Sequence, residues 1–67
     1  MDEDDRKLIV RLCTKAGCMM EDASAVAIGT AGRGASDLGE AVHSLVVIAE
    51  DIQKIVSAAE VLVKSTA

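Results

Sequence analysis

Apolar residues recur along the second half of the chain at alternating steps of four and three, the spacing of one face of a helix. The main row is Leu38, Val42, Leu45, Ala49, Ile52, Val56, Ala59 and Val63. A second row beside it is Ala41, Ile48, Ile55 and Leu62. The pattern predicts one long helix over about residues 36–66. Its apolar stripe is wider than a seam between two helices needs.

The first half of the chain carries a similar row. Its members are Ile9, Leu12, Ala16, Met19, Ala23 and Val26, widened by Leu8, Cys13, Met20 and Ala27. This row predicts a helix over about residues 3–28. Gly17 lies in its middle, where glycine costs about 1 kcal/mol relative to alanine. A break at Gly17 is the alternative, but the apolar phase runs through it unchanged, which favours a continuous helix.

Residues 29–35 form the turn-rich stretch of the sequence. Gly29 is placed to follow the first helix and Ser36 to cap the second. Asp37 and Lys64 have the signs that favour the two ends of a helix. A loop this short predicts an antiparallel, all-α hairpin. In the corresponding register, oppositely charged residues of the two helices would meet. The expected pairs are Lys15 with Glu50 and Asp51, Arg6 with Glu60, and Lys64 with the acidic start.

The composition suits helix packing but not an independent core. The 67 residues are 51% apolar and include no aromatic residue and no proline. A domain this small rarely gains more than about 3–5 kcal/mol from its own core. We therefore expect a symmetric homodimer that forms a four-helix bundle, with a larger oligomer or a different partner chain as alternatives. The expected interface residues are Leu38, Val42, Leu45, Ile48, Ile52, Ile55, Val56, Leu62, Ile9, Leu12, Met19 and Val26.

Net charge and hydropathy narrow the setting. The net charge is −4, which disfavours non-specific nucleic-acid binding by the whole domain. The acidic start is unlike a signal peptide, and the apolar runs are too short to span a bilayer. We expect a soluble, cytoplasmic protein with no membrane contact.

Residues with chemical potential are few. Gly29 and Gly34 are spaced like the glycines of a phosphate-binding loop, but the lysine that should follow is missing. We expect His43 to be a partly exposed helix histidine that pairs with an acidic side chain. We expect Cys13 in the core and Cys18 on the surface. A metal or redox role is a minor alternative, and it would use Cys18, His43, Met19 and Met20.

Two surfaces are candidates for partner binding. Val46 and Val47 form an apolar knob among polar residues, with membership of a broader dimer interface as the alternative. Arg33 stands at the tip of the turn. The second surface is a basic stripe made of Lys7, Arg11, Lys15 and Lys54. The sequence thus favours a non-enzymatic regulator or adaptor without a cofactor. Inhibitors and anti-regulators of phage, plasmid or bacterial origin are often this small and acidic, so we expect a protein of that kind. An RNA-binding hairpin dimer, using the basic stripe, is the alternative.

Overall fold

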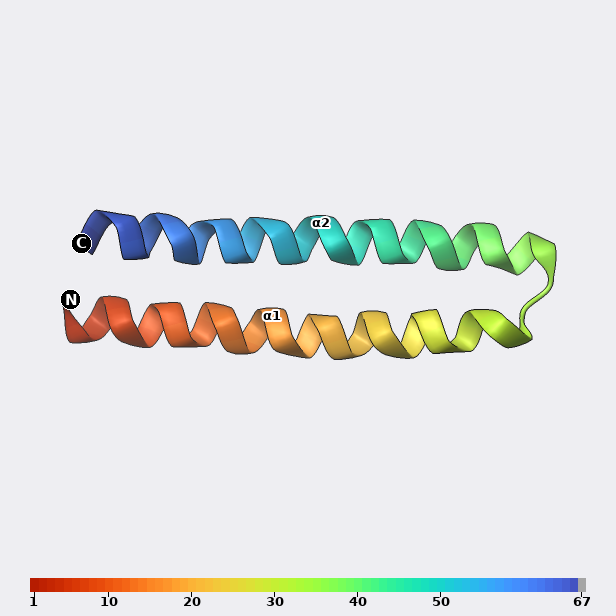
Figure 1. The fold of residues 1–67 in the computed structure, drawn as a ribbon, viewed down its shortest axis with the longest axis horizontal. Coiled ribbons are helices and arrows are strands. Elements are labelled where there is room, and N and C mark those ends of the chain that lie inside the picture. The colour runs from red at the N-terminus through yellow and green to blue at the C-terminus, as the bar shows by residue number, and fades with distance from the viewer. Residues whose placement is uncertain (67) are drawn as a thin grey trace.

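The chain folds into two long helices that lie side by side and run in opposite directions. The computed structural model describes residues 1–66, except for the side chains at positions 36 and 66. It contains α1 (Glu3–Gly29), a 3-10 turn (Thr30–Gly32) and α2 (Ala35–Thr66). The molecule measures 50 × 14 × 12 Å, and both ends of the chain lie opposite the turn (Figure 1). The prediction of an all-α hairpin is confirmed.

The start of α1 is stabilised by its own acidic residues. The carboxylate of Asp2 accepts a hydrogen bond of 3.3 Å from the backbone N–H of Asp4, as an N-cap residue does. Glu3, Asp4 and Asp5 occupy the first turn, where negative charge suits the helix dipole. Further along, the helix passes through Gly17 without a break. The predicted continuity of this helix is therefore confirmed.

The end of α1 differs from the expectation. Gly29 is still part of the helix, and its backbone is right-handed (φ −66°, ψ −16°). The chain then tightens into the 3-10 turn, where the backbone N–H of Thr30 donates to the carbonyl oxygen of Ala27. No glycine among residues 1–66 has a positive φ. The prediction that Gly29 follows the helix was therefore wrong, because backbone and side-chain bonds of Thr30 end the helix instead.

The second helix begins one residue earlier than expected, at Ala35. The carbonyl oxygen of Gly34 accepts from the backbone N–H groups of Asp37 and Leu38, both at 3.1 Å. Position 36 thus lies inside the first turn of α2. The capping bond predicted for the Ser36 side chain lies outside the described residues. The predicted charges at the helix ends, Asp37 and Lys64, are in place.

One row of side chains from each helix forms the seam between them. On α1 the buried and half-buried residues of the seam are those of the predicted row, namely Ile9, Leu12, Ala16, Met19, Ala23 and Val26. On α2 they combine the two predicted rows and are Ala41, Leu45, Ile48, Ile52, Ile55, Ala59 and Leu62. Among the described side chains only Ala16, Ala41 and Ala59 are buried. The large apolar residues of the seam all keep some contact with solvent.

Much of the longer predicted row on α2 lies outside the seam. The exposed members are Leu38, Val42, Ala49, Val56 and Val63. A helix with a single neighbour can cover only one narrow stripe of its surface, and the stripe on α2 is wider than that. The excess apolar surface faces solvent in the hairpin.

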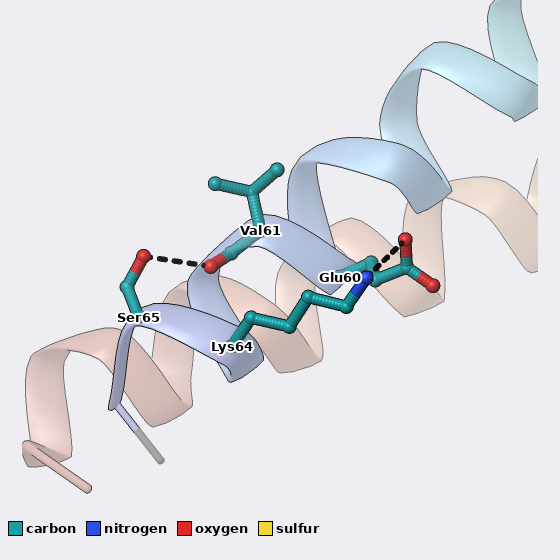
Figure 2. Close-up of polar contacts among 4 residues, drawn as sticks. All are labelled: Glu60, Val61, Lys64 and Ser65. Atoms are coloured by element: carbon teal, nitrogen blue, oxygen red, sulfur yellow. Dashed lines mark hydrogen bonds and ion pairs between the residues drawn. The ribbon is translucent and has the colours of Figure 1, made fainter.

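The ion pairs of the described residues lie within helices rather than between them. Arg6 pairs with Glu3 at 3.6 Å, and Lys64 pairs with Glu60 at 3.3 Å (Figure 2). The same close-up shows the hydroxyl of Ser65 donating to the carbonyl oxygen of Val61. The charge pairs predicted between the helices are not formed among the described residues. Arg6 and Lys64 pair instead with acidic residues one turn away on their own helices.

Over the described residues neither helix contains a stretch long and apolar enough to cross a bilayer.

Candidate interaction surfaces

The seam divides the outside of the hairpin into two long faces. Successive residues of a helix point about 100° apart, so the positions on either side of the seam belong to different faces. Along each helix the spacing between seam residues alternates between three and four. In two antiparallel helices, the residues that directly follow the seam residue at the start of each four-residue spacing lie on the same side of the pair. Each face is therefore built from both helices and runs along the hairpin.

One of these faces carries no charge over most of its length. We call it the uncharged face. All its members are exposed: Val10, Cys13, Gly17, Met20, Ser24 and Ala27 from α1, with Gly39, Val42, Val46, Ala49, Gln53 and Val56 from α2. Charged residues appear on this side only toward the open end of the hairpin, and they are Glu3, Arg6 and Glu60. The surface is long, apolar and rich in small side chains.

The opposite side, the charged face, has a different character. It consists of Leu8, Arg11, Lys15, Cys18, Asp22 and Ala25 from α1, with Asp37, Glu40, Ser44, Val47, Asp51, Lys54, Ala58 and Val61 from α2. Both signs of charge are interspersed along it. Such a surface is typical of a solvated side of a protein.

The helices bring most of the basic candidates together. Arg11, Lys15 and Lys54 share the charged face, while Lys7 lies at the outer edge of α1. Asp51 lies on the same face one turn from Lys54, so the positive patch is interrupted by a carboxylate. The local potential is accordingly mixed rather than uniformly positive.

Val46 and Val47 are neighbours in sequence but belong to different faces. Val46 is 48% exposed on the uncharged face, and Val47 is 43% exposed on the charged face. The two side chains point about 100° apart around α2. They therefore offer two separate contacts rather than one knob. Arg33 is exposed on the turn, and its side chain has no ion-pair partner among the described residues.

Gly17 stands near the middle of the uncharged face. A Cβ atom placed on this residue would meet nothing within 4 Å, and its backbone is helical. The hairpin itself therefore has no need of glycine here, although glycine weakens the helix by about 1 kcal/mol. Any structural reason for a glycine at this position therefore lies outside the contact between α1 and α2.

The cysteines and the histidine do not form a site. Cys13 and Cys18 are both free and exposed. The expectation of a buried Cys13 was wrong, because the seam is one residue to the side, at Leu12. His43 is also exposed. Within the described part of the chain, no three acidic, cysteine or histidine side chains group in a way that could hold a metal ion.

The surface is hollowed only slightly near the middle of α2. A shallow, open depression is lined by Glu50, Gln53, Lys54 and Ser57, all from the same helix. A site for a small molecule usually encloses its ligand between several elements. This depression is a groove between neighbouring side chains.

The predicted interface residues fall into two groups. Ile9, Leu12, Met19, Val26, Leu45, Ile48, Ile52, Ile55 and Leu62 lie in the seam of the hairpin and are half-buried. Leu38, Val42 and Val56 are exposed. The α1 side of the uncharged face was not recognised from the sequence. Its signal is present, because uncharged residues recur at steps of three and four from Val10 to Ala27.

Comparison of the chain with models of known families, with curated proteins and with solved structures finds no match.

Proposed function

We propose that this chain is a non-enzymatic interaction protein that works as a homo-oligomer. The simplest form is a symmetric dimer in which two hairpins make a four-helix bundle. In that form it would act as a regulator or adaptor, through contacts with other proteins. The proposal builds on the surface that the single hairpin leaves exposed.

The observation that carries the proposal is the amount of this surface. The hairpin exposes 4833 Å². A compact monomer of 6.9 kDa would expose about 4,000 Å² according to the usual scaling of area with mass. The excess of about 800 Å² is what each partner of a standard-sized interface buries. Burial of this area on each of two copies would therefore lower the exposed area per chain to about that of a compact monomer of the same mass.

The thin core supports the same proposal. Among the described side chains only three alanines of the seam are buried, so the hairpin gains little from its own packing. Burial of large apolar side chains is the main source of stability in small domains. A second copy would supply the missing coverage for the half-buried leucines and isoleucines of the seam.

The oligomeric state can be tested by light scattering and sedimentation over a range of concentrations. Interfaces of standard size bind at micromolar concentrations or more tightly. We expect twice the chain mass at roughly 10 µM and above, and co-purification of two differently tagged copies that are expressed together. A chain that stays monomeric and helical at roughly 1 mM would refute the proposal.

The adaptor role needs a separate test. Affinity purification of the tagged chain from its native host, followed by identification of the bound protein and RNA, would reveal a partner. Val47 and Arg33 remain candidates for its contact, because both are exposed away from the uncharged face. Loss of the bound protein on Val47→Glu or Arg33→Glu, with the dimer intact, would support the adaptor role.

RNA binding is the second candidate function, and the common location of Arg11, Lys15 and Lys54 favours it. Basic side chains on one face can follow a phosphate backbone. The Arg11→Glu, Lys15→Glu double variant should then lose a salt-sensitive RNA complex while keeping its helicity and its mass. Absence of retained RNA at low salt would eliminate this function.

A further inference from the structure

We infer that the uncharged face is the surface on which a second copy of this chain docks. This inference rests on the proposed self-association and adds where the contact is made. It assigns Val46 to the interface between copies and Val47 to the outside of the assembly.

The chemistry of the face points to an occupant of the same kind. A partner recognised by charge would need charged groups opposite it, and between Val10 and Ala27 on α1 and between Gly39 and Val56 on α2 the face has none. Its occupant must be apolar and elongated. The uncharged face of a second hairpin has both properties. Two-fold symmetry places each half of such a surface against its counterpart, so one patch can serve both partners.

The alternative interface between two copies, formed by their charged faces, is less favourable. Two charged faces placed together would bring Arg11, Asp22 and Asp51 into a dry interface with their copies. Removing charges from water costs several kcal/mol for each ion unless every one is well paired. The mixed charges of that face therefore favour contact with solvent.

The glycines on the uncharged face support the assignment independently of charge. A Cβ atom would meet nothing within 4 Å at either Gly17 or Gly39, and both residues are inside helices. A residue without a side chain lets another backbone approach closely. Gly17 lies midway along α1, between Cys13 and Met20, where an opposing helix would cross.

The adjacent valines provide a matched test. Val46→Glu and Val47→Glu make the same substitution in the same turn of α2, at positions of almost equal exposure. In the docked dimer Val46→Glu buries two uncompensated charges, and the dissociation constant should rise more than about 100-fold. Val47→Glu should leave the dissociation constant within about threefold of the original, because the new charge faces water. Sedimentation equilibrium measures both values, and circular dichroism reports the helicity of each variant.

The outcomes separate this inference from the proposal beneath it. A monomeric parent chain would remove the self-association and, with it, this inference. A dimeric parent that is broken by Val47→Glu, equally by both variants, or by neither of them would overturn the assigned face while leaving self-association intact. Should Val46→Glu lose its helicity, Val42→Ser against Ser44→Val offers a milder pair on the two faces. There a weaker dimer for Val42→Ser alone is expected, and no difference between the two would overturn the inference.

Discussion

The hydroxyl of Thr30 donates a hydrogen bond of 2.7 Å to the carbonyl oxygen of Ala27, at the point where α1 tightens into the 3-10 turn. The backbone N–H of the same threonine bonds to the same oxygen. Together the two bonds satisfy a carbonyl group near the end of the helix, where regular helical partners run out.

Replacing Thr30 by valine should therefore lower the stability of the hairpin. The change keeps the shape of the side chain and removes one hydrogen bond, which is worth about 0.5–1.5 kcal/mol. Thr14→Val is the matched control, because the Thr14 hydroxyl bonds to the carbonyl of Val10 in the helix interior. Thr14 is exposed whereas Thr30 is half-buried, so water replaces the lost hydrogen bond more easily in the control, and its stability should change less. Urea unfolding of both variants makes the comparison, and equal losses would contradict it.

Substitution of Gly17 by alanine should have opposite effects on the hairpin and on its association. At concentrations too low for association, the stability should rise by about 1 kcal/mol, because alanine favours the helix and nothing obstructs its methyl group. In the proposed dimer, which forms at high concentration, the same methyl group would stand between two closely packed backbones. The gain in melting temperature should then shrink or reverse. A gain that is the same at every concentration would show that Gly17 lies outside the interface.

Enlarging a buried alanine should separate the helices. Ala41 is 2% exposed in the seam, so Ala41→Leu should cost about 1–3 kcal/mol through overpacking. Ala58→Leu is the control, because Ala58 is an exposed alanine of the same helix. Its substitution should change the stability by less than about 0.5 kcal/mol. Thermal unfolding at one fixed concentration compares the two, and an Ala41→Leu variant as stable as the parent would contradict the burial of Ala41 in the seam.

The ion pair between Lys64 and Glu60 should contribute little. Both side chains are largely exposed, and pairs of this kind are worth about 0.3–0.5 kcal/mol. Lys64→Met keeps the helix propensity nearly constant. The unfolding midpoint of this variant in urea should closely match that of the parent. The midpoint of the variant should also depend on salt no more strongly than the midpoint of the parent does. A large loss would mean that Lys64 makes a contact beyond the one with Glu60.

The sequence predicted the seam on α1 but not the seam on α2, and the difference has a physical cause. Ile9, Leu12 and Met19 belong to a single row, so their common face was unambiguous. On α2 the seam takes Leu45 and Ile52 from one predicted row and Ile48 and Ile55 from the other. Periodicity places all these residues on one broad apolar side. The partner helix is narrower than this apolar side and covers only one stripe of it. The choice of that stripe depends on how the two helices pack, which is a tertiary property.

The end of α1 and the position of Cys13 show the same limit. Gly29 in this position is typical of a left-handed cap, but hydrogen bonds from Thr30 end the helix in another way. Cys13 directly follows the seam residue Leu12, so a step of one residue along the helix leads from the seam to the uncharged face. The two faces themselves could have been derived from the sequence once the seam was known, since a helix turns by a fixed angle per residue.

The turn has one further consequence. Gly29 and Thr30 already have right-handed helical backbones, whereas Arg33 is extended (φ −98°, ψ 150°). Rotation of a short segment around Arg33 would align α1 and α2 into one rod. Two such rods could then exchange their second halves and rebuild the seam between chains, as in domain swapping. A swapped pair would withstand Val46→Glu, and lengthening the turn with glycine and serine would disfavour it.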